Sequence, residues 1–292
     1  MFTIVHKQII AQNIKRIDIA APSIAAKTAP GQFVMVTPGA QDHAVPLTVV
    51  EADGRKGVVS LIVHEIGAAT RALGAASIGD PVNAIIGPLG RPAVIEKYGV
   101  VICVATGIGA AQILPICRAL KKKANKVIGI IGAKSKRELM LEAQMRVVCD
   151  EIFITTNDGS YERKGLATQL LRELLDKYKV DAVYAIGSVD MMQAASTMAG
   201  EKHIPVRVTL SPYMANGLGL CGSCRVRVGG EFRLACTDGP EFDGHEVDFG
   251  DLNKRDQAKE KSWGNQSRLA SPKNAGFITA VKSFWGLPKN KI

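Results

Sequence analysis

From residue 97 to residue 210, short apolar segments alternate with segments of helical periodicity, and this alternation constrains the fold more than any other feature. The apolar segments are GVVICVAT, KVIGIIGAK, EIFITTND and DAVYAIGS. The helical segments are GIGAAQILPICRALKKK, SKRELMLEAQMRVV, GLATQLLRELLDKY and VDMMQAASTMAGEK. Strands that each lead into a helix form a parallel sheet covered by helices on both faces. Residues 97–210 are therefore predicted to be an α/β nucleotide-binding domain.

Residues 1–96 show a different pattern, in which short segments rich in β-branched residues are separated by Gly, Pro and Asp. These segments are FTIVHKQII, IKRIDIA, QFVMVTP, VPLTVVEA, GVVSLIVHEI and DPVNAIIGPLG, with one helical segment, ATRALGAA. Five or six strands in this space predict a small antiparallel β-barrel. Residues 211–250 are rich in Gly and Cys and are predicted to form a separate small module.

Three of the six cysteines cluster in the segment NGLGLCGSCRVRVGGEFRLAC, with the spacing Cys221-x2-Cys224-x11-Cys236. Two thiolates separated by two residues can bind one iron from a tight loop, and a hairpin turned at two glycines brings the third. Plant-type [2Fe–2S] loops carry a further Cys five residues before the first of such a pair. That position is Asn216 here. The predicted cluster ligands are therefore Cys221, Cys224, Cys236 and Asn216.

Two other interpretations of this segment remain open. Cys-x2-Cys also suits a tetrahedral zinc site, for which His245 is available although it lies beyond the hairpin. The segment is also compatible with a reduced surface loop that binds no metal. The other cysteines, Cys103, Cys117 and Cys149, stand in apolar surroundings and are predicted to be buried.

Glycines at the ends of the predicted parallel strands indicate a nucleotide site. Thr106, Gly107, Ile108 and Gly109 join the first of these strands to its helix. The free N–H groups and the dipole of a helix N-terminus favour a pyrophosphate at such a position. Gly187 and Met191 lie in an equivalent strand-to-helix connection. Helices that begin with glycine are common without any ligand, so this motif alone does not identify the site.

Asn157 and Asp158 follow the strand EIFITT. A carboxylate there would accept a hydrogen bond from a ribose 2′-hydroxyl and repel a 2′-phosphate, which favours NAD over NADP. Lys134, Lys136 and Arg137 follow another strand end and favour the phosphate instead. An ordinary Asp-Gly turn without a ligand is a further interpretation.

Together with VPLTVVEADG, HEIGAATRAL and CGSCRVRVGGEFRLACTDGPEFDGHEVDF, these motifs resemble the ferredoxin–NADP reductase superfamily. Residues 1–250 are similar to the electron-transfer subunit of dihydroorotate dehydrogenase. They are also similar to the small subunit of the electron-bifurcating NADH-dependent ferredoxin:NADP oxidoreductase, also called sulfide dehydrogenase. The resemblance implies FAD in the barrel, NAD(H) on the α/β domain and a [2Fe–2S] cluster in the cysteine loop. It implies flavin contacts at Val45, Pro46, Leu47, Thr48, Ile62, Val63, His64, Gly67, Ala68, Ala69 and Thr70.

The chain departs from the family at two places. An Arg that the family usually carries near the start of the flavin motif corresponds to Ala44 or Val45, and His43 is the nearest substitute. At the position of Asn216, dihydroorotate-type subunits carry Cys and the bifurcating small subunit carries Asp. A neutral ligand there would raise the potential of the cluster.

The resemblance implies that electrons pass between NADH, FAD and the cluster, and on to a larger flavin and iron–sulfur subunit or to ferredoxin. A flavin suits this path because it exchanges hydride with a nicotinamide and single electrons with a cluster. No side chain is expected to act as an acid or a base. Two alternatives are a degenerate subunit that only scaffolds a redox complex, and the electron-transfer subunit of a dihydroorotate dehydrogenase.

The composition limits the location and the partners of the chain. Hydrophobic residues make up 47% and charged residues 22%, a globular balance. The longest apolar run, Val100 to Ala105, is too short to span a bilayer, and the N-terminus does not resemble a signal peptide, so a cytoplasmic location is expected. The segment from Asn253 to Ile292 holds nine Lys or Arg and two Asp or Glu, which is +7 of the net charge of +10. Residues 251–292 are therefore predicted to be a basic tail that docks on a partner, and nucleic-acid binding is not expected.

Overall fold

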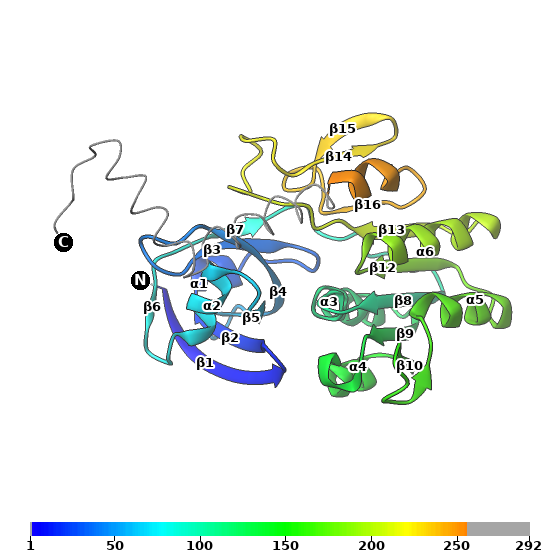
Figure 1. The fold of residues 1–292 in the computed structure, drawn as a ribbon, viewed down its shortest axis with the longest axis horizontal. Coiled ribbons are helices and arrows are strands. Elements are labelled where there is room, and N and C mark those ends of the chain that lie inside the picture. The colour runs from blue at the N-terminus through cyan, green and yellow to red at the C-terminus, as the bar shows by residue number, and fades with distance from the viewer. Residues whose placement is uncertain (1, 256–292) are drawn as a thin grey trace, which may run out of the picture. The chain divides into compact units, whose positions relative to one another are not determined.

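The N-terminal part of the computed structural model, which describes residues 2–255, is a seven-stranded antiparallel sheet that curls into a nearly closed barrel (Figure 1). Its strand order is β6-β1-β2-β5-β4-β3-β7. Two short helices, α1 (Pro22–Ala25) and α2 (Ala68–Ala75), accompany it. The strands are β1 (Phe2–Ala11), β2 (Ile14–Ala20), β3 (Phe33–Thr37), β4 (Val45–Asp53), β5 (Val58–His64), β6 (Pro81–Val82) and β7 (Ala84–Leu89).

The alternation of side chains along the strands explains how the barrel is attached to the next part of the chain. On β5, Val59, Leu61 and Val63 are fully buried in the barrel interior. Ile62 points the opposite way, because successive side chains of a strand face opposite sides of the sheet. With Ile14 and Val50 it joins the hydrophobic core of the α/β part. The barrel and the α/β part therefore share a core, and residues up to Phe249 form one compact unit, after which a second begins at Gly250.

The second sheet confirms the predicted α/β fold, with the strand order β11-β10-β9-β8-β12-β13-β16. The first six of these strands run parallel, and β16 pairs antiparallel with β13 at the edge. Helices cover both faces, α3 and α4 on one and α5 and α6 on the other (Figure 1). The strands are β8 (Val100–Thr106), β9 (Lys126–Ala133), β10 (Glu151–Thr156), β11 (Arg163–Lys164), β12 (Ala182–Ile186), β13 (Val206–Thr209) and β16 (Glu241–Asp243). The helices are α3 (Gly109–Lys122), α4 (Glu142–Val148), α5 (Ala167–Lys177) and α6 (Val189–Glu201).

One predicted helix is interrupted. The segment SKRELMLEAQMRVV forms a 3₁₀ turn, η1 (Lys136–Glu138), and then α4. Leu141, just before α4, has the left-handed φ of 58°. Both Met140 and Leu141 are buried in the α/β core. Burial of these two side chains decides the backbone path here against a continuous helix.

The cysteine-rich module contains a hairpin of β14 (Arg225–Val228) and β15 (Glu231–Leu234). Gly229 and Gly230 turn it with φ of 61° and 80°, as a tight two-residue hairpin loop requires. The module returns to the α/β sheet through β16. The domain boundaries at residues 96, 210 and 250 stay predictions.

Among residues 2–255, no helix has the length and hydrophobicity needed to cross a bilayer. Most of the predicted basic tail, including Trp263 and Trp285, lies outside the described residues.

Candidate functional site

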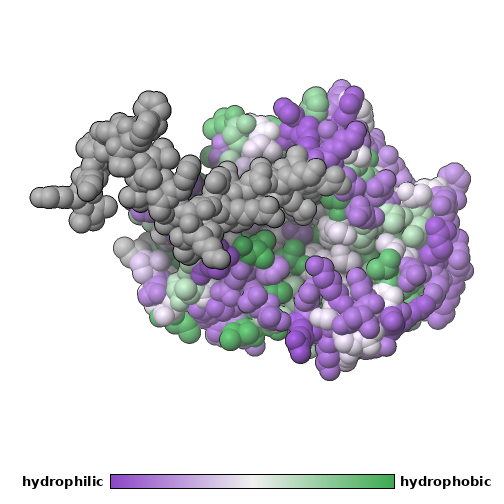
Figure 2. Space-filling view, viewed as in Figure 1, coloured by the Kyte–Doolittle hydropathy of each residue, from purple (hydrophilic) through white to green (hydrophobic). Residues whose placement is uncertain are grey.

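A cavity of about 190 Å³ lies where the barrel, the α/β part and the cysteine-rich module meet. On the face drawn in Figure 2, hydrophobic residues are visible between the barrel and the α/β part, while the hairpin of the module is strongly hydrophilic. The lining of the cavity is mostly apolar, with a few hydroxyl and amide groups, which is typical of a site for a planar organic ligand. Whole drug-sized ligands occupy roughly 300–1,000 Å³, so this cavity suits a ring system rather than a complete dinucleotide.

Several residues predicted to contact the flavin line this cavity. Pro46, Leu47 and Thr48 come from β4 and Ile62 from β5. Opposite them is Ile108, from the glycine-rich connection that was predicted to bind the nucleotide. The structure therefore brings together two motifs that lie about 60 residues apart in the sequence.

Other residues in the predicted flavin set do not line the cavity. Val63 points into the barrel interior, where it is fully buried. His64 lies at the end of β5, and Val45 at the start of β4. Gly67, Ala68, Ala69 and Thr70 form the start of α2, where the Gly67 N–H donates to Thr70 Oγ1 at 2.9 Å. His43, the suggested substitute for the missing Arg, is exposed.

The sequence reasoning missed part of the wall. The segment just after β13 also lines the cavity, through Leu210, Ser211, Pro212 and Met214. Gln112 of α3 donates to Ser211 Oγ at 3.1 Å and closes one side. No local pattern points to these residues, because they reach the cavity only through the path of the chain between β13 and the cysteine loop.

The predicted nucleotide motif lies at the carboxyl ends of β8 and β12. These two strands are neighbours, but the chain leaves β8 toward β9 on one side and returns to β12 on the other. Such a reversal of strand order marks the ligand site of open α/β sheets. The sites of Thr106 and Gly109 on one connection therefore meet those of Gly187 and Met191 on the other.

Glycine is required in these connections because the backbones approach closely. A Cβ on Gly109 would lie 2.3 Å from the Ile186 carbonyl oxygen. One on Gly187 would lie 2.0 Å from Thr106 Oγ1. Gly107 has a left-handed φ of 55°, and a Cβ there would have no atom within 4 Å. Glycine is favoured at this position by the backbone conformation and not by a close contact.

Asp158 lies two strands away, in a second hollow formed with Ser135, Lys136, Arg137 and Ser160. The Ser160 N–H and hydroxyl both donate to Asp158 Oδ1, at 2.9 and 2.7 Å. These two bonds hold the pKa of Asp158 below its usual value. Asn157 is bonded to the neighbouring strand end, its N–H donating to the Ala133 carbonyl at 3.0 Å. Asp158, which favours NAD, thus lines the same hollow as Lys136 and Arg137, which favour NADP.

The three clustered cysteines are arranged as a pair and a single thiol. Cys224 and Cys236 are buried, with their Sγ atoms 3.2 Å apart. Burial and the adjacent Cys224 raise the pKa of Cys236 to about 11. Cys221 is exposed, and its Sγ lies 3.1 Å from Ser223 Oγ. Within residues 2–255, no three His, Cys, Asp or Glu side chains converge on one point as ligands of a single ion would.

The surroundings of Cys221 favour an anion. Its pKa is lowered by a hydrogen bond from the Ser223 side chain, and further by the N–H groups of Ser223, Asn216 and Ala215. Gly217, Gly219 and Gly222 all have left-handed φ, 71°, 78° and 67°, and let the loop bend around the thiol. Soft thiol donors and converging N–H groups fit an iron–sulfur cluster, whose ligands are shared between metal ions.

The two non-cysteine ligand candidates have other partners. Asn216 Oδ1 accepts from the Leu218 N–H at 3.0 Å, which forms a local turn. His245 Nε2 lies 3.0 Å from the Ile204 carbonyl oxygen, beside α6. Of the lone cysteines, Cys103, Cys117 and Cys149 are all buried, as predicted.

Comparison with known proteins agrees with this arrangement. Residues 211–248 match the family model of the iron–sulfur cluster binding domain of dihydroorotate dehydrogenase B. A dihydroorotate dehydrogenase B (NAD(+)) electron transfer subunit homolog from Thermotoga maritima is 37% identical, over 86% of this chain and 89% of that one. The electron transfer subunit from Desulforamulus reducens is 32% identical, over 82% of this chain and 94% of that one.

A solved structure shows the same architecture. It is that of an NADH-dependent reduced ferredoxin–NADP oxidoreductase, described for its flavin-based electron bifurcation. One of its chains superposes with a TM-score of 0.85 at 34% identity, covering 93% of this chain and 98% of that one. The ferredoxin-reductase-like fold predicted from the sequence is thereby confirmed.

Proposed function

Because the chain belongs to the family of dihydroorotate dehydrogenase B electron transfer subunits and their homologues, we propose that it moves electrons between NAD(H), FAD and a [2Fe–2S] cluster. It passes them on to a larger subunit that holds further redox groups. The bound flavin supplies the exchange between hydride and single electrons, while the protein sets orientation and potential. No side chain of this chain needs to act as an acid or a base in the hydride transfer.

The observation that carries the proposal is the shared cavity. Pro46, Leu47 and Thr48 form its barrel side, and Ile108 lies on its nucleotide side. A flavin ring held against β4 would face a nicotinamide held at the start of α3. Leu210 to Met214 would exclude water from the meeting point, which protects a hydride during transfer.

The cysteine loop packs directly on the barrel, so the path onward is short. A Cβ on Gly217 would lie 2.7 Å from Met35 Cγ on β3 and 3.0 Å from Leu89 Cδ1 on β7. The Arg91 N–H, just after β7, donates to the Gly239 carbonyl at 2.6 Å. Cys221, Cys224 and Cys236 would hold the cluster, with Asn216 as the candidate for the remaining ligand position.

The preferred nucleotide is NAD(H). Asp158 is held in place by Ser160 and its pKa is lowered, so it is charged at neutral pH. A carboxylate accepts hydrogen bonds from a ribose diol and repels a 2′-phosphate. Lys136 makes a cation–π contact, with its Nζ 4.7 Å from the centre of the Tyr161 ring.

The partner is proposed to be the larger subunit of a ferredoxin–NADP oxidoreductase. The structural match at TM-score 0.85 spans 98% of a chain from such an enzyme and supports this choice. The second candidate is the catalytic subunit of a dihydroorotate dehydrogenase, which the named relatives support. Assays of the purified complex with NADPH and ferredoxin, and separately with dihydroorotate, distinguish the two.

The first test is an anaerobic visible spectrum of the purified chain, with flavin and iron assays, before and after NADH. About one FAD and two irons per chain, bleached by NADH, are expected. Zinc without flavin would contradict the proposal and support a scaffold subunit.

Matched cysteine variants identify the ligands. Cys224→Ala should lose the iron and its absorbance but keep flavin, because the barrel side of the cavity is unchanged. Cys149→Ala, which changes a buried thiol far along the chain in the α/β core, should keep both. Full iron content in Cys224→Ala would remove the cluster from this loop.

A further inference from the structure

Glu241, on β16, is a half-buried residue, and one oxygen of its carboxyl group is buried. Its Oε1 accepts a hydrogen bond from the Val94 N–H at 2.9 Å. Its Oε2 is buried and has no hydrogen-bond partner within the described part of the chain. The Val94 carbonyl in turn accepts from the Tyr184 hydroxyl, so the Glu241 carboxyl sits against the segment that joins the barrel to the α/β part. A buried carboxylate oxygen without a partner is costly, and protonation removes that cost.

Glu241 is among the residues that line a cavity of about 520 Å³ between the α/β edge and the cysteine-rich hairpin. Three guanidinium groups line the cavity, those of Arg91, Arg207 and Arg233. Two of them face carboxylates of their own: Arg91 lies 3.7 Å from Asp238, and Arg233 lies 2.8 Å from Glu231.

The remaining charged groups around Glu241 are acidic or neutral. Asp243 and Glu246 line the same cavity. Tyr184 of β12, whose hydroxyl donates to the Val94 carbonyl, has a pKa raised mainly by burial. The charge of Arg207 favours the ionised form of Glu241, but burial outweighs it and raises the pKa of Glu241 to about 7. At neutral pH, a small change in the local electrostatic potential therefore changes the protonation of Glu241.

Glu241 lies close to the clustered cysteines along the chain. Four residues separate Glu241 from Cys236. Cys236 itself lies in a tight turn in which the N–H groups of Thr237 and Asp238 both donate to the Leu234 carbonyl, at 3.1 and 2.8 Å. Asp238 Oδ2 accepts from the Leu234 N–H at 2.8 Å and fixes the turn. Because Glu241 follows Cys236 by five positions, with this turn at the cysteine, negative charge that arrives at the thiols raises the electrostatic cost of a second negative charge on Glu241.

We propose that Glu241 is the proton acceptor coupled to reduction of the iron–sulfur cluster held by the adjacent cysteines. One electron from the bound flavin or from an external reductant enters the cluster, and one proton from solvent, by way of the cavity that Glu241 lines, binds the Glu241 carboxyl group. Reoxidation releases the same proton, so charge is balanced in both directions. This inference rests on the proposed function, since it requires the cluster. Glu241 does not contact substrate. Its protonation compensates the charge of the reduced cluster, so its effect on the reaction is indirect.

The test is a mediated redox titration of the cluster in the purified full chain, at a series of pH values from 5.5 to 8.5. The wild type should show a midpoint potential that falls as pH rises around neutrality. Glu241→Gln keeps the shape and the oxygen that Val94 contacts but cannot take up a proton, so its potential should not change with pH. Glu246→Gln, an exposed acid in the same cavity, should behave as the wild type.

A redox-difference infrared spectrum of the wild type needs no variant. A protonated-carboxyl band that grows on reduction is expected, and its absence in Glu241→Gln assigns it. A pH-independent potential in the wild type, or an unchanged pH dependence in Glu241→Gln, overturns this inference while the cluster and the proposed function stand. A purified chain without iron overturns both.

Discussion

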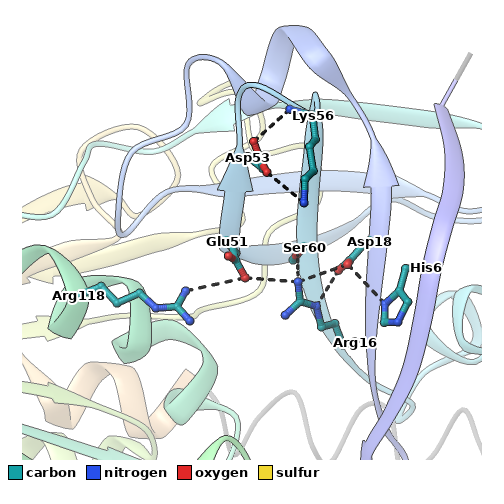
Figure 3. Close-up of polar contacts among 8 residues, drawn as sticks. All are labelled: His6, Arg16, Asp18, Glu51, Asp53, Lys56, Ser60 and Arg118. Atoms are coloured by element: carbon teal, nitrogen blue, oxygen red, sulfur yellow. Dashed lines mark hydrogen bonds and ion pairs between the residues drawn. The ribbon is translucent and has the colours of Figure 1, made fainter. Parts of the chain in front are cut away.

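The Glu51 carboxylate on β4 lies 4.0 Å from the Arg118 guanidinium on α3, and so joins the barrel to the helix that begins at the nucleotide motif. The same carboxylate lies 3.3 Å from Arg16 of β2 (Figure 3). Arg16 is the centre of this group: it donates to Asp18 at 2.8 Å and to Ser60 Oγ at 2.8 Å. A partly exposed ion pair between the barrel and α3 therefore continues into a more buried network within the barrel.

The two arginines should differ in their effect on stability. Arg16→Met leaves the buried Asp18 with only His6, whose Nδ1 lies 3.4 Å from Asp18 Oδ2, and should lower the free energy of unfolding by about 2–3 kcal/mol. Arg118→Met breaks only a partly exposed pair at long distance and should cost less than about 1 kcal/mol. Urea unfolding of both variants measures the difference, and equal losses would contradict the distinction between the buried and the exposed part of the network.

Gly109 should tolerate no side chain. In Gly109→Ala the new Cβ meets the Ile186 carbonyl and forces the start of α3 away from β12, which should cost about 1–3 kcal/mol of stability and weaken NADH binding. In Gly107→Ala the new Cβ contacts no atom. Only the left-handed φ is unfavourable for alanine, and it should lower the free energy of unfolding by about 1 kcal/mol. Fluorescence titration with NADH and thermal unfolding compare the two variants. NADH affinity in Gly109→Ala equal to that of the wild type would place the nucleotide elsewhere.

Asp158 should set the choice between nucleotides. Asp158→Asn removes the charge that repels a 2′-phosphate, leaves the nearby Lys136 and Arg137, and should raise kcat/KM for NADPH relative to NADH by about tenfold. Ser160→Ala loosens the carboxylate but keeps its charge, so its change should be smaller. Steady-state reduction of an artificial acceptor with each nucleotide provides the measurement. An unchanged ratio in Asp158→Asn would show that this hollow does not contact the ribose.

Glu241 should also make stability depend on pH. Its folded-state pKa of about 7 is raised above the value of 4.5 expected when it is solvated, so the folded state is favoured when the group is protonated. This contribution is complete below about pH 4.5 and is lost as the pH rises through about 7. Relative to Glu241→Gln, the wild type should therefore lose roughly 3 kcal/mol of unfolding free energy between these pH values. Parallel pH profiles of the two proteins would contradict the assignment.

Much of the fold follows from local patterns. The alternation of apolar and amphipathic segments after residue 97 predicted the parallel sheet, and the β-branched segments before it predicted the barrel. The spacing of Cys221, Cys224 and Cys236 identified the module that the family model matches at residues 211–248. These features could be recognised because each depends on residues that are near one another in the chain.

The candidate site could be predicted only in part. The break at Leu141 depends on a core that the helical pattern does not reveal. The wall from Leu210 to Met214 reaches Thr48 only because the barrel and the α/β part share a core through Ile62.

The sequence by itself determined which segments become strands and helices and which residue types stand at their ends. Only the tertiary structure decided that Thr48 and Ile108 line one cavity, that Gly109 meets Ile186, and that Glu241 Oε2 is buried with no hydrogen-bond partner among residues 2–255. The physical reason is that periodicity and spacing act over a few residues. Burial, close backbone approach and charge compensation depend on which distant segments pack together.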